Sequence, residues 1–218
     1  AARRLRESRA VTWRLAFLPP RPFPDPAQEA AFLADYCQSF AAHRRISGLV
    51  ALLIWVGFLG WDYIMGRMDG AIWPQTPALT AIRVLGTVVL MVAVQMTRRP
   101  AFATNERYAV RVLVAGCWGM FLVAYVMMWM VPFPYNYLYY FFELLMIMVF
   151  AAGPLHLGSR QAMTFMSMCT VIYLLSVLWR LYLGAMPMEV PETIYPWASF
   201  VFLLALAIVG SIMSVQTE

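Results

Sequence analysis

Four charged side chains interrupt otherwise apolar stretches of the sequence, and they are the residues best suited to chemistry: Asp62, Arg83, Glu143 and Arg180. At mid-depth in a membrane a charge costs roughly 2.5–3.5 kcal/mol, so such groups normally pair or line a polar cavity. We expect all four in the outer half of the membrane, where two acids and two arginines can neutralise one another. Three interpretations remain open: a salt-bridge network that fixes helix packing, the polar floor of a ligand pocket that opens outward, or side chains that reach the interface.

Aromatic side chains gather at the same expected depth. The run PFPYNYLYYFFE at 132–143 is denser than an interfacial aromatic belt requires, so we expect some of its rings to face inward. The alternative is that these rings belong to the belt alone. Four aromatic residues are candidate walls of the pocket: Trp129, Tyr137, Tyr140 and Trp179.

The sequence lacks the patterns of familiar catalytic and metal sites. It has no P-loop, no GxSxG and no HExxH. The two histidines, His43 and His156, fall at expected helix ends rather than at the depth where haem ligands would lie. The three cysteines form no CxxC and are expected to be small buried apolar side chains. We therefore predict no enzymatic activity in this chain, no cofactor and no metal.

The elements that position these residues follow from composition. The chain is 62% hydrophobic and only 12% charged, whereas soluble domains are ~45–50% apolar and ~25% charged. Continuous apolar runs, each near the ~20 residues that a membrane-spanning helix needs, exclude a barrel. We predict an all-α integral membrane bundle of six transmembrane helices joined by short turns, at about 46–65, 77–97, 108–131, 136–154, 161–183 and 194–215.

The residues before the first span divide into two parts. Residues 1–25 form a basic, proline-rich tail, and 26–45 form an amphipathic interfacial helix that Asp25 caps and Pro26 begins. The bundle itself occupies 46–218. The apolar stripe of the amphipathic helix consists of Phe32, Leu33, Tyr36 and Phe40.

Orientation follows from the arginines, which are the only basic residues besides histidine. Thirteen of the 16 lie in the N-terminal region, between 98 and 111, or at 160, and three lie on the opposite side. The positive-inside rule places the first group in the cytoplasm, and an even number of spans brings the C-terminus there too. The basic tail is expected to meet anionic lipid rather than nucleic acid.

Three features together resemble a known type of domain. They are the lead-in DPAQEAAFLADYCQSFAAHRR, the span LIWVGFLGWDYIMG with Asp62 near its outer end, and six spans that finish in the polar SVQTE. Residues 26–218 resemble the six-helix membrane input domain that precedes bacterial class III adenylate or guanylate cyclase domains, and sometimes diguanylate cyclases or histidine kinases. The resemblance implies a bacterial inner-membrane location and a cytoplasmic output domain after Glu218. No cyclase domain is present, so no catalytic residue carries over.

The expected function is therefore that of a membrane sensory or regulatory domain. A small apolar or amphipathic ligand would bind in the outer half, and the last helix would transmit the change in packing. Expected partners are the lipid bilayer and either a second copy of the chain or a larger membrane complex. An accessory structural subunit is the main alternative. A transporter or channel is a weaker one, because the prolines, among them Pro154 and Pro196, are expected between spans or at their ends.

Overall fold

The computed structural model describes residues 25–65, 67, 76–131, 135–183 and 190–216. Within these residues the chain is all-α, as predicted. Its elements are α2 (Pro26–Met65), α3 (Thr76–Thr97), α4 (Ala101–Thr104), α5 (Glu106–Met130), the π-helical turn η1 (Asn136–Tyr140), α6 (Phe141–Ala152), α7 (Ser159–Tyr182) and α8 (Val190–Gln216).

Helix length and hydropathy make this a multi-pass membrane protein. Four helical segments of the described chain are long and apolar enough to cross a bilayer: Ala30–Ile64, Thr76–Thr97, Glu106–Met130 and Arg160–Tyr182. Two shorter apolar segments accompany them, Phe141–Ala152 and Ile194–Gly210. Every predicted span coincides with helix, although the fourth is divided between η1 and α6.

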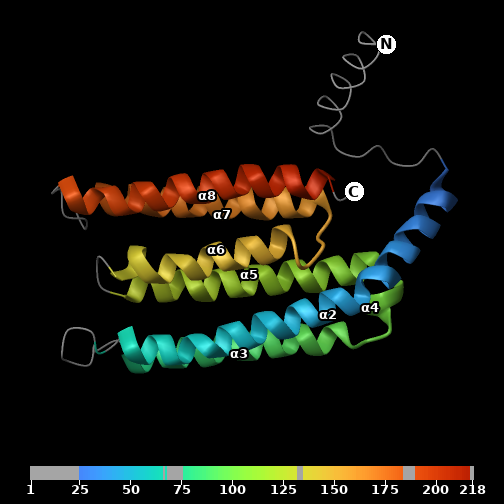
Figure 1. Ribbon diagram of the computed structural model, residues 1–218, viewed down its shortest axis with the longest axis horizontal. Helices are drawn as coiled ribbons and strands as arrows, with labels where there is room; N and C mark the ends of the chain where they lie inside the picture. The colour runs from blue at the N-terminus through green and yellow to red at the C-terminus, as the bar shows by residue number, and fades with distance from the viewer. Residues whose placement is uncertain (1–24, 66, 68–75, 132–134, 184–189, 217–218) are drawn as a thin grey trace, which may run out of the picture.

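The amphipathic segment and the first span form one continuous helix, α2. The backbone N–H of Ala27 donates to Asp25 Oδ1 at 2.9 Å, which confirms the predicted cap. No helix end separates 26–45 from the span that follows, and the first turns of α2 project beyond the bundle (Figure 1). The basic tail before Asp25 lies outside the described residues.

The long helices run side by side in three layers (Figure 1). The pair α5 and α6 forms the middle layer, with α2 and α3 on one side and α7 and α8 on the other. The short helix α4, the turn at 153–158 and the last turns of α8 lie at the same end of the bundle, which we call the α4 end. The opposite end is called the far end.

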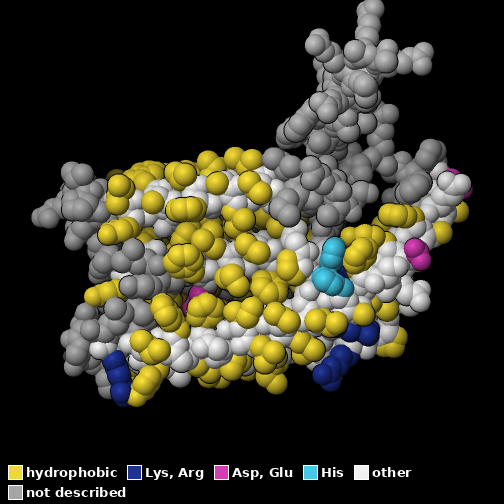
Figure 2. Space-filling model, viewed as in Figure 1, with side chains coloured by type: hydrophobic (Ala, Val, Ile, Leu, Met, Phe, Trp, Pro, Cys, Tyr) yellow, Lys and Arg dark blue, Asp and Glu magenta, His cyan; other side chains and the backbone are white. Residues whose placement is uncertain are grey.

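Burial is concentrated on α5, whose side chains face both neighbouring layers. The outer faces of α2, α3, α7 and α8 instead expose large apolar side chains, with Leu53 72% exposed and Phe202 65% exposed. Figure 2 shows hydrophobic side chains covering most of the visible face of the bundle. An apolar surface of this extent suits lipid rather than water.

One proline departs from expectation. Pro196 lies inside α8 rather than at a helix end, and the hydroxyl of Tyr173 on α7 donates to its carbonyl at 3.4 Å. The argument that the prolines avoid the interiors of the membrane helices therefore fails for α8. Pro154 does lie after the end of α6, in the turn that leads to α7.

Candidate functional site

Three of the four predicted charged residues meet in one buried cluster near the far end. Arg83 on α3 donates from Nε to Asp62 Oδ2 and from Nη2 to Asp62 Oδ1, both at 2.7 Å. On its other side it donates from Nη1 to Glu143 Oε2 at 3.0 Å, and Nη2 reaches Glu143 Oε1. All three side chains are at most 3% exposed. Paired N–H donors on a carboxylate are a strong, directional form of ion pair, so this cluster ties α2, α3 and α6 together.

Aromatic side chains complete the surroundings of the cluster. The hydroxyl of Tyr140, in the π-helical turn, donates to Asp62 Oδ1 at 2.9 Å. The Arg83 guanidinium carbon lies 4.2 Å from the ring centre of Trp55 and 5.5 Å from that of Phe58. Trp55 Nε1 also donates to the Arg83 carbonyl at 3.1 Å. The ring of Trp55 therefore shields the guanidinium by cation–π contact and is itself held by the α3 backbone.

Arg180, the fourth predicted charge, lies apart from the cluster. Its Nη2 donates to the Trp129 carbonyl at 3.3 Å, and its guanidinium carbon lies 3.5 Å from the Trp129 ring centre. The expectation that two acids and two arginines neutralise one another is therefore wrong. The reason is the layering: Arg180 belongs to α7, on the other side of α5 from α2 and α3, so it meets α5 instead.

The predicted aromatic walls are also divided. Tyr140 joins the charge cluster and Trp129 pairs with Arg180. Tyr137 is buried, and its ring centre lies 6.5 Å from that of Tyr173 on α7. Trp179 is 61% exposed on the outside of the bundle. The eight candidate residues do not surround one cavity.

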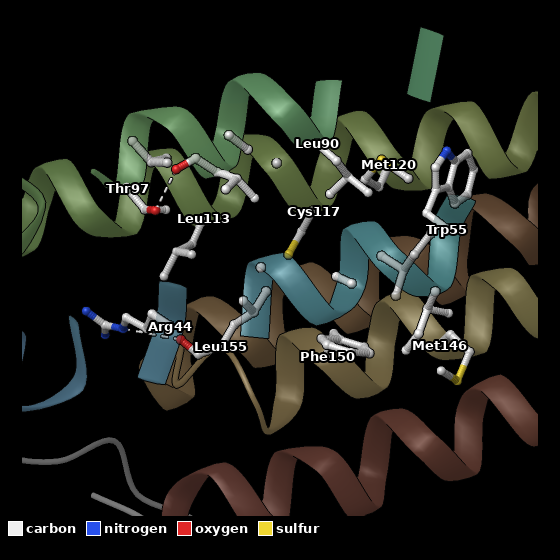
Figure 3. A pocket seen from close by; sticks show the side chains of 18 of the residues that line it. Arg44, Trp55, Leu90, Thr97, Leu113, Cys117, Met120, Met146, Phe150 and Leu155 are labelled. Carbon is white, nitrogen blue, oxygen red and sulfur yellow. Dashed lines mark hydrogen bonds between the residues drawn. The ribbon is translucent and has the colours of Figure 1, made fainter. Parts of the chain in front are cut away.

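An apolar cleft of about 100 Å³ lies between α2, α3, α5 and α6. Figure 3 shows the side chains of these four helices around it, with Arg44 toward one end and Trp55 toward the other. Glu143 is the one member of the predicted site that lines the cleft. Its other lining residues include Ala51, Leu90, Val94, Leu113, Cys117, Met120, Met146, Ile147 and Phe150.

Sequence reasoning missed this cleft because most of its walls are ordinary apolar residues. One feature of the sequence could have indicated the cleft. Small residues lie where α2, α3 and α5 face one another: Gly48, Ala51, Ala93 and Gly116. Small side chains leave space between helices where larger ones would fill it. Only the packing of the helices shows which of the many small residues face a shared space.

A second, partly buried ion pair lies at the α4 end, and from the sequence its arginine counted only toward membrane orientation. Arg44 pairs with Glu106 through Nη1, at 3.2 Å from Oε2. Its Nε donates to the Leu155 carbonyl at 3.2 Å and its Nη2 to the His156 carbonyl at 2.8 Å. Ser47 Oγ donates to the Pro154 carbonyl at 2.9 Å. These bonds fasten the turn between α6 and α7 to α2.

Both histidines lie at this fastened turn. The ring centres of His43 and His156 are 4.8 Å apart, and His156 has a positive φ of 45°. Burial first, and then the charges of His43 and Arg44, lower the pKa of His156 below its ordinary value of 6.5. The His156 ring is therefore neutral near pH 7 and lies at the edge of the bundle, far from the depth of a haem ligand.

The described residues offer no metal centre. No three of their His, Cys, Asp or Glu side chains come together in a way that would hold an ion. The cysteines, Cys37, Cys117 and Cys169, are buried free thiols, as the sequence predicted. What the arrangement can do chemically is to receive an apolar molecule in the cleft, with the Glu143 carboxylate near one end.

Comparisons of the chain with models of protein families, with curated proteins and with solved structures found no match. No family is identified. The resemblance to cyclase input domains therefore rests on the sequence features that carry it.

Proposed function

We propose that this chain is a sensory or regulatory domain with six membrane-embedded helices, which binds a small apolar or amphipathic ligand in the cleft between α2, α3, α5 and α6. The observation that carries the proposal is the cleft itself, an apolar space bounded by four helices. Well-packed interiors rarely leave such space, and apolar cavities of comparable size are known to take apolar ligands. The candidate site is thereby reduced to Glu143 and its cluster, with Arg180, Trp129, Tyr137 and Trp179 outside it.

The route of transmission runs through α6. One side of α6 lines the cleft with Glu143, Met146, Ile147 and Phe150, while α8 packs against the same helix. At that contact Gly210 is so close to its neighbours that an added Cβ would lie 3.1 Å from the Cβ of Ala152. A ligand that shifts α6 therefore moves the surface on which α8 rests. Such a ligand acts only if it binds the two packings with different affinity.

The sequence resemblance supports the same function. In an input domain the last membrane helix joins the output domain, which here would follow α8. The location that goes with this function is a bacterial inner membrane, with the α4 end in the cytoplasm and the chain paired with a second copy.

An accessory structural subunit is the second candidate, and one observation favours it. Gly57 and Gly60 are exposed on α2, and nothing lies within 4 Å of the position of an added Cβ at either residue. Small residues on an outer helix face allow close approach of another membrane helix. A subunit of this kind would need no response of α8 to a molecule in the cleft.

The test measures the distance between α4, which does not line the cleft, and α8, which we expect to move when a ligand binds. Spin labels at Thr104→Cys and Val209→Cys, two exposed positions, report the α4–α8 distance by pulsed electron paramagnetic resonance in lipid nanodiscs. We expect 1-dodecanol, a neutral apolar probe, to shift the distance distribution. Ala51→Leu, which fills the cleft from α2, should abolish the shift.

The matched control is Ala81→Leu, the same substitution at an exposed position of α3 that does not line the cleft. It should respond like the parent protein. A distribution that stays unchanged while the probe demonstrably binds would overturn the sensory function and leave the accessory subunit as the better explanation.

A further inference from the structure

The two ion clusters at the ends of the cleft differ in their numbers of acidic and basic groups. At the α4 end one guanidinium, Arg44, faces one carboxylate, Glu106. Each nitrogen of Arg44 is also engaged, because Nε and Nη2 donate to backbone carbonyls and both Nη atoms donate to Glu106. The Arg44–Glu106 pair is therefore balanced, and Arg44 has no nitrogen without a partner that could hold the anionic group of a ligand.

The cluster at the other end has more acidic groups than basic ones. There one guanidinium, Arg83, faces two carboxylates, Asp62 and Glu143. Among the described residues no second cation forms an ion pair with either carboxylate. Arg180 stacks on Trp129, and the exposed Arg67 stacks on Tyr63 at 4.0 Å.

An unbalanced charge in an apolar interior is costly, because little solvent is present to screen it. The same low polarity strengthens the attraction between that charge and a cation placed beside it. Both carboxylates accept two hydrogen bonds from Arg83, and Asp62 also accepts one from the Tyr140 hydroxyl, but of the two only Glu143 lines the cleft. A cation in the cleft would therefore meet the cluster at Glu143.

We infer that the ligand of the cleft is a cationic amphiphile, an elongated apolar molecule with a protonated amine that lies against Glu143. Its apolar body extends along the cleft toward Arg44, past Ile147 and Phe150. The amine of the bound ligand gives the cluster one cation for each carboxylate. This inference rests on the proposed function, since it names the chemical class of the ligand that the sensory domain would bind.

The experiment compares three probes of equal chain length: dodecylamine, 1-dodecanol and dodecanoate. Binding to the full chain is measured by isothermal titration in nanodiscs of zwitterionic lipid, with partition into empty nanodiscs subtracted. We expect dodecylamine to bind about ten- to a hundredfold more tightly than 1-dodecanol, the range of a charge-assisted hydrogen bond, and dodecanoate to bind most weakly.

Glu143→Gln tests the origin of this preference. It leaves Arg83 with one carboxylate, so the cluster becomes neutral, and dodecylamine should lose its advantage over 1-dodecanol. Asp35→Asn, which removes an exposed carboxylate from α2 far from the cleft, should keep the preference. Ala51→Leu should weaken all three probes together while leaving the cluster intact, which keeps the inference testable if Glu143→Gln fails to fold.

The outcomes separate this inference from the proposed function. Equal binding of dodecylamine and 1-dodecanol, both weakened by Ala51→Leu, would overturn the cationic ligand and leave an apolar ligand site in place. Binding of none of the probes would overturn both. Tighter binding of dodecylamine that persists in Glu143→Gln would show that the amine is held elsewhere, and would also overturn the inference.

Discussion

Arg83 on α3 connects its own helix to α2 and to α6, and two buried carboxylates depend on its charge. Asp62 and Glu143 are both buried, and each accepts two hydrogen bonds from the same guanidinium. Removal of the cation would leave two like charges close together in an apolar environment. The contribution of Arg83 to stability is therefore mainly the cost of leaving its partners unpaired.

We accordingly expect Arg83→Met to lower the free energy of unfolding by about 3–5 kcal/mol, the usual effect of breaking a buried ion pair. Arg180→Met is the matched control. It removes a half-buried arginine that contacts the carbonyl and ring of Trp129 and the side chain of Tyr137 but forms no ion pair among the described residues, so we expect a loss of only about 1 kcal/mol. Thermal unfolding in nanodiscs measures both.

The triple variant Asp62→Asn, Arg83→Met, Glu143→Gln provides a rescue. Because neutral amides then replace both carboxylates, no buried charge is left unpaired, and most of the lost stability should return. Equal losses for Arg83→Met and Arg180→Met, without rescue, would show that the cluster does not stabilise the fold in this way.

At the scale of elements, the contact between α2 and α3 depends on one glycine. A Cβ added at Gly86 would lie 2.5 Å from Cζ2 and 2.8 Å from Cε2 of Trp55. The Trp55 indole lies beside Gly86, where it covers the Arg83 guanidinium and donates a hydrogen bond to the Arg83 carbonyl. The absence of a side chain at Gly86 thus allows the aromatic cover of the charge cluster to form.

Gly86→Ala should therefore destabilise the protein, by about 1–3 kcal/mol, because the rigid ring and backbone have to move apart. Gly60→Ala on the exposed face of α2 is its matched control. There an added methyl group meets nothing, so we expect no loss and a gain of at most about 1 kcal/mol from helix propensity. Thermal unfolding of both variants checks this, and a harmless Gly86→Ala would contradict the role given to the close approach.

The π-helical turn η1 acts at the same scale. It directly precedes α6 and contains Tyr137 and Tyr140, both buried, while Glu143 follows in the first turn of α6. Turns of this type are rare and change the direction in which the neighbouring side chains point. Here η1 directs Tyr140 toward Asp62 on α2, and α6 directs Glu143 toward Arg83 on α3.

At the scale of the whole molecule, charge is distributed unequally between the two ends. The described arginines at the α4 end include Arg44, Arg45, Arg98, Arg99 and Arg107, whereas Arg67 lies at the far end. The positive-inside rule then predicts that the α4 end faces the cytoplasm. Both the start of α2 and the end of α8 belong to that end, so the described chain enters and leaves the bundle on one side (Figure 1).

Labelling of single cysteines in intact cells tests this orientation. We expect Arg67→Cys to react with a membrane-impermeant maleimide from outside. Thr104→Cys, on α4, should react only after the cells are opened. The native cysteines are buried, and the parent protein gives the background labelling. The reverse pattern would invert the orientation, and would place the Asp62 cluster near the cytoplasmic face.

The sequence by itself determined the class of the molecule and the positions of its helices. Long continuous apolar runs admit few structures other than membrane helices, because each backbone group has to be bonded within its own segment. The cap at Asp25 was predictable for a similar reason, since it depends on neighbouring residues only. The rarity of charge in the apolar runs also drew attention to four charged residues, of which Asp62, Arg83 and Glu143 do meet.

The tertiary structure alone decided which residues meet. Arg83 and Arg180 are both single arginines within apolar runs of the sequence. The layering of the helices places Arg83 between two carboxylates, whereas Arg180 lies against the ring and carbonyl of Trp129. The cleft, the fastening of the 153–158 turn by Arg44, and the contact of Gly86 with Trp55 likewise depend on which helix faces fit together. Helix formation in a membrane is local, whereas packing depends on the shapes of side chains that are far apart in the sequence. The excess of acidic over basic groups in the cluster can be recognised only once those side chains are brought together.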